Sequence, residues 1–206
     1  MLEALGVGAV VVDVFDAGAL KKALWAASPD VVIHQLTDLS GDHDAASIEG
    51  KLRGNARLRR EGTANLVAAA TEIGVKRIIA QSIGWAYAPK APPFAETDPL
   101  DVQATGQRAI TISEGVVPLE SAILEQAAFE GVILRYGQLF GPGTWTAEPT
   151  GAAPLHVEAA AYAAFLAVTR GRPGVYNIAN RGGALTIDKA LSELGWLPDF
   201  RLDGQV

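Results

Sequence analysis

The sequence predicts one α/β domain, a parallel sheet covered by helices on both faces. Short β-branched runs alternate along the chain with segments whose apolar residues recur at helical spacing. The short runs are continuously apolar rather than alternating, as expected for strands buried on both faces. The length of 206 residues and the apolar fraction of 49% suit a single domain with a real core and exclude a disordered chain.

The first half of the chain provides two strands and two helices. Gly8–Phe15 (GAVVVDVF), a β-branched run bounded by glycine and aspartate, predicts a buried strand. Ala17–Ala27 has leucines and alanines at helical spacing and ends at Ser-Pro-Asp, which predicts a helix. Val31–Leu36 (VVIHQL) predicts a second strand. A long helix is expected over Asp44–Ile73, with its two internal glycines as candidate breaks and Gly74 as its C-terminal cap.

The second half repeats the alternation. Four prolines mark a loop over Pro89–Pro99. Apolar runs predict three more strands, and apolar residues at helical spacing predict three more helices. The strands are Ile78–Ser82, Val132–Tyr136 and Gly174–Ile178, and the helices are Pro118–Glu130, His156–Thr169 and Thr186–Leu194.

Composition narrows the class of protein. The net charge of −6 argues against a nucleic-acid partner. The longest apolar run, Ala159–Val168, is half the ~20 residues that a membrane span needs. Met1–Gly8 lacks the basic start of a signal peptide, so we expect a cytoplasmic protein without a membrane partner. The absence of cysteine and the scarcity of histidine predict no metal site, and Gly41–Asp44 is interpreted as a loop and helix N-cap.

A parallel sheet binds ligands at the carboxyl ends of its strands. The residues that follow each expected strand are therefore the candidates for a functional site. They are Asp13, Gln35–Asp38, Ser82–Tyr87 and Tyr136–Gly143.

Several segments, in this order and spacing, resemble a known family. EGTANLVAAATEIGVKRIIAQSIGWAYAP (61–89), VILRYGQLFGPGTW (132–145) and HVEAAAYAAFLAVTRGRPGVYNIAN (156–180) resemble the extended or atypical short-chain dehydrogenases/reductases, in particular the NAD-dependent epimerases/dehydratases. The resemblance covers nearly the whole chain. It implies a single Rossmann-like domain over residues 1–206, with 141–206 as a small substrate-side region. It also implies NAD or NADP as cofactor and a small carbonyl, hydroxyl or sugar-nucleotide substrate.

The chain departs from this family at the phosphate-binding turn. Members open with a strand, a Gly-x-x-Gly-x-x-Gly turn and a helix, whose backbone amides receive the pyrophosphate. Here Gly6 and Gly8 form only Gly-x-Gly, before an expected strand rather than after one. By resemblance, Met1–Gly6 corresponds to the tail of the second helix. The fold is therefore expected to be N-terminally shortened, and NAD or NADP to bind weakly.

A second departure concerns proton transfer. The family carries Tyr-x-x-x-Lys on a helix, in which the tyrosine is the general acid and the lysine lowers its pKa. Aligning Glu125 with a glutamate common on that helix puts Val117 and Ser121 at these two positions. The loss does not depend on this alignment, because no tyrosine or lysine lies between Ala91 and Leu134.

Other site residues remain by resemblance. Five would contact the cofactor, and three could supply a proton in place of the absent tyrosine. Most of them have an alternative structural role. Asp13 would be a turn carboxylate and Gln35–Thr37 ordinary polar loop residues. Ser82 would be a hydrogen-bonded serine at a strand end, and Tyr87 and Tyr136 would be core residues. Aligning Tyr87 with a common family tyrosine also puts Ile83, not Ser82, at the catalytic serine position. The cofactor residues are Asp13, Val14, Gln35, Leu36 and Thr37, and the catalytic candidates are Ser82, Tyr87 and Tyr136.

Two functional hypotheses follow. The first is an NAD(P)-dependent oxidoreductase of the epimerase/dehydratase type, and the alternative is a non-catalytic shortened member that serves as a binding or assembly module. A hydrolase is disfavoured because Gly-x-Ser-x-Gly is absent. The family commonly dimerises through two helices that correspond to Asp44–Ile73 and Pro118–Glu130. Since only 19% of residues are charged, which suggests surface hidden in a partner, we expect a homodimer.

Overall fold

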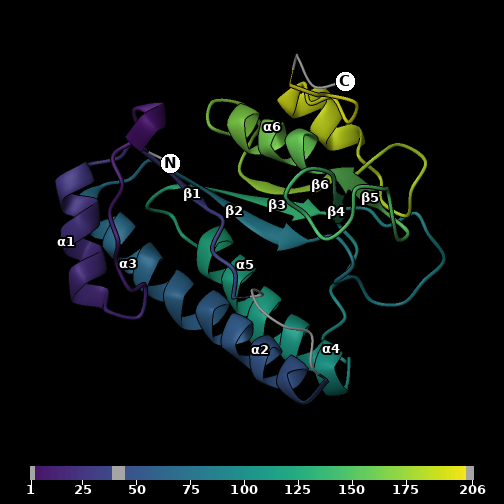
Figure 1. The fold of residues 1–206 in the computed structure, drawn as a ribbon, viewed down its shortest axis with the longest axis horizontal. Helices are drawn as coiled ribbons and strands as arrows, with labels where there is room; N and C mark the ends of the chain where they lie inside the picture. The colour runs from purple at the N-terminus through teal and green to yellow at the C-terminus, as the bar shows by residue number, and fades with distance from the viewer. Residues whose placement is uncertain (1–2, 39–44, 203–206) are drawn as a thin grey trace.

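A four-stranded parallel sheet forms the centre of the molecule (Figure 1), in a computed structural model that describes residues 3–38 and 45–202. The strand order is β1-β2-β3-β6, and each neighbouring pair is parallel. The strands are β1 (Val31–His34), β2 (Arg77–Ile83), β3 (Glu130–Tyr136) and β6 (Gly174–Ile178), and β4 (Gln138–Phe140) pairs with β5 (Pro154–His156) in a separate small sheet.

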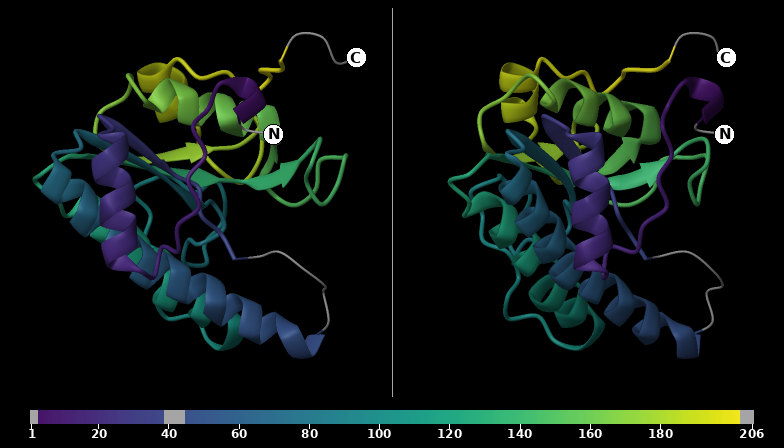
Figure 2. Two further views of the ribbon diagram at one scale, coloured as in Figure 1. Left: turned by 60° about the vertical axis from the view of Figure 1, so that its left-hand side comes forward. Right: turned by 90° about the vertical axis from the view of Figure 1, so that its left-hand side faces the viewer.

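Helices cover both faces of the sheet, as Figures 1 and 2 show, so the predicted fold class is confirmed. On one face, α3 (Thr63–Ile73) and α5 (Val117–Leu124) enclose a core that includes Ile78, Ala80 and Ile133. On the other face, α6 (Val157–Ala167) and η4 (Ala190–Leu194) enclose the larger core. Alternate strand residues therefore point into different cores. Residues 141–206 contribute α6 and β6 to this architecture, and their link to the substrate stays a prediction.

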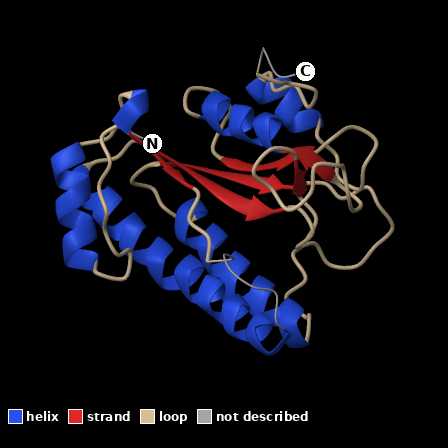
Figure 3. Cartoon of the chain, viewed as in Figure 1, coloured by secondary structure: helices blue, strands red, loops and turns tan. Residues whose placement is uncertain are grey.

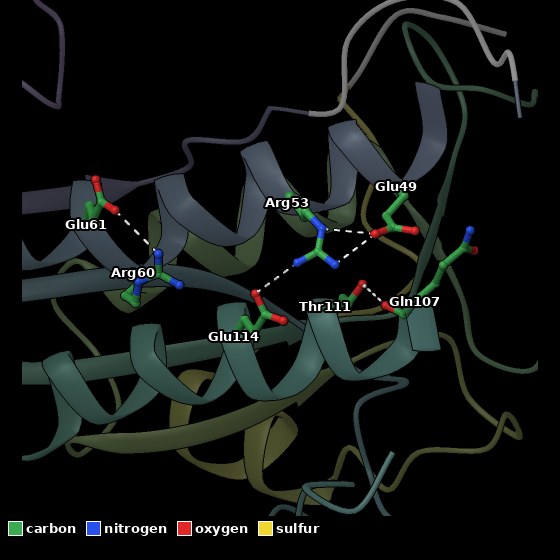
Figure 4. Close-up of polar contacts among 7 residues, drawn as sticks. All are labelled: Glu49, Arg53, Arg60, Glu61, Gln107, Thr111 and Glu114. Atoms are coloured by element: carbon green, nitrogen blue, oxygen red, sulfur yellow. Dashed lines mark hydrogen bonds and ion pairs between the residues drawn. The ribbon is translucent and has the colours of Figure 1, made fainter. Parts of the chain in front are cut away.

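Two long helical segments lie side by side beneath the sheet. The first continues from α2 (Ala45–Arg57) through the π-helical turn η2 (Leu58–Gly62) into α3, so it is not broken at Gly50 or Gly54. The second continues from α4 (Gly106–Thr111) through the π-turn η3 (Ile112–Val116) into α5. Figure 4 shows their outer side, where Arg53 of α2 contacts both Glu49 and Glu114.

The predicted first strand is wrong. Gly8–Phe15 is not a strand, and Val10 and Val11 are 70% and 103% exposed. The sheet ends at β1, and among the described residues Gly8–Phe15 forms no ladder with β1 or with any other strand. A β-branched run that pairs with no strand does not form part of a sheet. The segment therefore runs as the loop drawn in Figure 3 before the predicted helix, α1 (Ala17–Ala27), begins after the Asp16 N-cap.

Several predicted boundaries also move. The predicted helix Pro118–Glu130 begins earlier, through α4 and η3, and ends at Leu124, where the chain must turn to enter β3. The predicted helix Thr186–Leu194 shortens to its last turns. β4 and β5 were not predicted because three residues are too short for a pattern, and Glu3–Leu5 form a single 3₁₀ turn (η1). The predicted Gly41–Asp44 N-cap lies outside the described residues. Among the described residues, no helix has the length and apolar character needed to cross a bilayer.

Candidate functional site

The loop after β1 is held in place by side chains beneath it. His34 is buried at the end of β1, and its Nδ1 accepts a hydrogen bond from the Leu36 backbone N–H (3.3 Å). Asn55 Oδ1 accepts hydrogen bonds from Thr37 Oγ1 (3.2 Å) and from the Asp38 N–H (2.9 Å). The three predicted groove residues, Gln35, Leu36 and Thr37, are thus exposed on a loop of fixed backbone geometry.

The other two predicted cofactor residues, Asp13 and Val14, lie in the loop before α1. Val14 packs against the continuous helix α2–η2–α3, farther along it than Asn55. Asn65 donates to the Val14 carbonyl oxygen (3.0 Å), and a Cβ on Gly62 would lie only 3.1 Å from Val14 Cγ1. Asp13 is exposed and accepts the Phe15 N–H (2.9 Å), the geometry of a turn carboxylate. Asn55 and Asn65 are ten residues apart, about 15 Å along a helix, so the two parts of the predicted groove are separated.

Ser82 belongs to a buried ionic network. Its Oγ donates to Glu120 Oε1 (2.6 Å), and Arg135 binds the same carboxylate through Nε (3.0 Å) and Nη2 (2.6 Å). Ser82 and Arg135 are register partners in β2 and β3, so they share the face covered by α5. All three side chains are buried. The Glu120 carboxylate therefore accepts a hydrogen bond from the Ser82 hydroxyl and neutralises the Arg135 guanidinium.

Tyr87 joins the same network through Arg135, whose guanidinium lies 4.8 Å from the centre of the tyrosine ring. The Tyr87 hydroxyl donates to Asn177 Oδ1 (2.5 Å). Burial raises the pKa of Tyr87, although the Arg135 charge opposes this shift. The structure thus provides Tyr87 with a cation, while the net effect still favours the protonated phenol.

Tyr136 points to the opposite face of the sheet. Its hydroxyl donates to the Ala160 carbonyl oxygen of α6 (3.2 Å), and burial raises its pKa strongly. It lines an apolar cavity of about 370 Å³ together with Gln35 and Gln81. The structure therefore links Ser82 and Tyr87 through Arg135 and points Ser82 and Tyr136 to opposite faces of the sheet, whereas Tyr87 belongs to the same hydrophobic core as Tyr136.

The glutamate that meets the sheet is Glu120, because Glu125 is exposed at the end of α5. Using Glu120 as the reference moves the expected Tyr and Lys positions from Val117 and Ser121 to Ile112 and Val116. Both are fully buried apolar residues of η3. The Tyr-x-x-x-Lys pair is therefore absent whether Glu125 or Glu120 is used as the reference for the alignment.

A smaller cavity of about 230 Å³ lies at the carboxyl ends of β2 and β3. Its walls include Trp85, Tyr87 and Phe94, and the last two rings are stacked with centroids 5.4 Å apart. Arg108 lines it too, held by Asp101 (2.7 Å) and the Tyr87 carbonyl oxygen (2.9 Å). The flat aromatic walls suit a planar ring.

Sequence reasoning missed Glu120, Arg135 and Asn177. The available signal was the polar residues within apolar strands, Ser82 and Arg135, which must find partners when buried. A parallel sheet with helices on both faces defines an α/β protein of the Rossmann-like class.

The chain belongs to the NAD dependent epimerase/dehydratase family, which it matches over residues 4–173. It is 36% identical over 214 residues to a 3-diazoavenalumate denitrifying reductase from a Streptomyces species. That alignment covers 93% of this chain but only 66% of the relative, so the chain spans about two thirds of the length of that protein.

Solved structures share the fold. UDP-glucose 4-epimerase from Thermus thermophilus in complex with NAD has a TM-score of 0.73 at 18% identity, over 96% of this chain and 81% of that one. The WbmG enzyme of Bordetella bronchiseptica in complex with NAD has a TM-score of 0.71 at 18% identity, over 96% and 76% of the two chains.

The residues present fit a dinucleotide in part. The loop after β1 is exposed and is anchored by Asn55 of α2. The loop that contains Asp13 and Val14 is held by Asn65 of α3. The described residues contain no strand followed by a glycine-rich turn and a helix, the element that holds a pyrophosphate. The described residues thus offer no backbone cradle of this kind for the phosphates of a dinucleotide, and the predicted cofactor residues stay a prediction.

Proposed function

We propose that this chain is an NAD(P)-dependent reductase whose substrate accepts hydride without a proton from the protein, and that this substrate is an arenediazonium compound. The observation that carries the proposal is the state of the three candidate donors. Ser82, Tyr87 and Tyr136 each donate to an internal acceptor, and the pKa values of both tyrosines are raised. The name of the relative from Streptomyces, a denitrifying reductase of a diazo compound, supports the same substrate class.

The balance of the reaction explains why an acid is not needed. A carbonyl that accepts hydride becomes an alkoxide and requires a proton. An arenediazonium cation that accepts hydride forms one C–H bond, loses its C–N bond and releases neutral dinitrogen. Charge, hydrogen and electrons balance without a proton. The small carbonyl or sugar-nucleotide substrates implied by the resemblance would lack a donor here.

The protein would then bind and orient the ring. The cavity between Trp85, Tyr87 and Phe94 offers stacking faces for an arene. Glu120 and Arg135 fix Ser82 and Tyr87 beside it, so we assign these side chains to positioning. Tyr136 would line the second cavity next to Gln35.

NAD or NADP would bind over the anchored loop of Gln35, Leu36 and Thr37, with Asp13 and Val14 toward the adenine end. A bound nicotinamide supplies the hydride. Asn55 and His34 would keep the loop backbone in place through the hydrogen bonds that they make with it.

The test follows reduced nicotinamide consumption with a carboxylated arenediazonium salt and with matching aldehydes and ketones. A deuterated nicotinamide should leave one deuterium on the arene, read by mass spectrometry. Reactions without protein correct for the intrinsic reactivity of the salt. We expect S82A, Y87F and Y136F to reduce the diazonium within roughly threefold of the wild-type rate, whereas losing a proton donor costs about 10²–10⁴-fold.

A different pattern would assign a donor. Faster turnover of a ketone than of the diazonium salt, with Y136F slowed about 10²-fold, would make Tyr136 a general acid and reject the proposal. A 10²-fold slower ketone reduction in Y87F or in S82A would instead assign the role of general acid to Tyr87 or to Ser82.

The second candidate is a non-catalytic binding or assembly module. It is favoured by the open edge of β1 and by the lack of a phosphate-binding turn in the part of the chain that the structure describes. No turnover of either substrate class, with NADH and with NADPH, would support it.

We further propose that the protein is a cytoplasmic homodimer that associates through α2–α3 and α4–α5.

A further inference from the structure

Arg59 is a buried cation that is incompletely hydrogen-bonded in the part of the chain that the structure describes. The residue is 4% exposed, and its Nε and Nη1 are buried with no hydrogen-bond acceptor among the described residues. It lies in the π-turn η2, packed against the π-turn η3, where Gly115 faces Ala56 and the Arg59 side chain: a Cβ on Gly115 would lie 3.3 Å from Ala56 Cα. Such turns within helices are frequent at functional sites.

The charges around Arg59 do not balance it. Glu120 is the acid whose charge reaches Arg59, but its carboxylate already accepts two hydrogen bonds from Arg135 and one from Ser82. Arg135 itself keeps a buried Nη1 without a partner. His34 is no counter-charge, because burial and the nearby Arg59 lower its pKa to about 4. Within residues 3–38 and 45–202, two guanidinium groups thus share one carboxylate, which leaves one positive charge in excess.

The site lies under the predicted cofactor groove. Asn55, one helical turn before Arg59, holds the loop at Thr37 and Asp38, and His34 ends the strand that enters this loop. A ligand in the groove would approach Arg59 past this exposed loop.

We propose that Arg59, assisted by Arg135, binds an oxyanion, a phosphate or carboxylate group, at the carboxyl end of β1 and β2. Guanidinium groups bind such oxygens through paired N–H donors. An unpaired buried cation is costly to the fold, and an anion that enters would remove this cost. This inference does not depend on the diazonium proposal.

The experiment is thermal unfolding of the whole chain in chloride, phosphate or acetate at constant ionic strength. The variants are R59M, R59K and R60M, the last a matched control because Arg60 is exposed and contacts Glu61 (Figure 4). Without phosphate or acetate, we expect R59M to melt at the wild-type temperature or above it. At about 100 times the Kd, phosphate or acetate should raise the melting temperature of the wild type and R60M by roughly 5–10 °C, of R59K by less and of R59M not at all.

The two anions distinguish the source of the ligand. A shift with phosphate alone indicates a phosphate group, and a shift with acetate also indicates a carboxylate. The proposal is overturned if R59M fails to fold or melts well below the wild type in chloride, because Arg59 is then a structural partner of Glu120. It is equally overturned if R59M keeps the anion shift, or if neither anion stabilises the wild type.

Discussion

At the scale of single residues, Glu120 organises the carboxyl edge of the sheet. Its carboxylate accepts one hydrogen bond from the Ser82 hydroxyl and two from Arg135, and the Arg135 guanidinium in turn lies over the Tyr87 ring. The sequence could place Ser82 at a strand end because strand ends follow from apolar runs. It could not assign the partner, because Glu120 is 38 residues away and the Glu125 alternative has the same residue type.

A pH-dependent stability follows from His34. Burial, together with the nearby positive charge of Arg59, lowers the pKa of His34 to about 4. Because the folded pKa lies below the unfolded value of ~6.5, His34 contributes its full stability above pH 6.5 and loses it as the pH falls toward 4. We expect the wild type to lose about 2–3 kcal/mol more than H34Q between pH 7.5 and 4.5 in urea unfolding. Parallel losses in the two proteins would contradict this.

At the scale of elements, prediction succeeded where local pattern and tertiary context agree. The four strands of the sheet are apolar runs with neighbours to pair with, and all four were predicted. Gly8–Phe15 has the same pattern but pairs with no described strand, so it is a loop in which Val10 and Val11 are exposed. The π-turns η2 and η3 could not be predicted, because they arise from the packing of two helices against each other.

The paired helices also give a prediction for assembly. Two exposed positions in the first two turns of α3, Ala64 and Ala68, are small, so a second copy can approach closely there. We expect light scattering at tens of micromolar to give twice the chain mass of 21.5 kDa. A68R should return it to the mass of one chain, because a long cation would separate the helices. A26R on the exposed side of α1 is the control and should stay dimeric. A wild-type monomer would reject the dimer.

At the scale of the whole molecule, the fold class was predictable because a buried parallel sheet leaves a strong pattern in the sequence. The candidate site was predictable only as a set of strand ends. Its division between two faces follows from side-chain alternation in β2 and β3, which puts Arg135 with Ser82 and Tyr136 with α6. The groove residues were predicted from resemblance, and their contacts came from the loop geometry that Asn55 imposes.

The last prediction concerns cofactor affinity. A phosphate-binding turn supplies charge-assisted backbone hydrogen bonds, each worth about 1.5–3 kcal/mol, and two missing bonds weaken binding about a hundredfold or more. We therefore expect this 206-residue chain to bind NAD and NADP with Kd values in the high-micromolar range or weaker in calorimetry. N55A should weaken binding further, because it frees the loop at Thr37 and Asp38, whereas A26R on α1 should leave the Kd unchanged. A sub-micromolar Kd would mean that another segment of the chain cradles the phosphates. An N55A chain that binds as well as the wild type would remove the loop after β1 from the cofactor site.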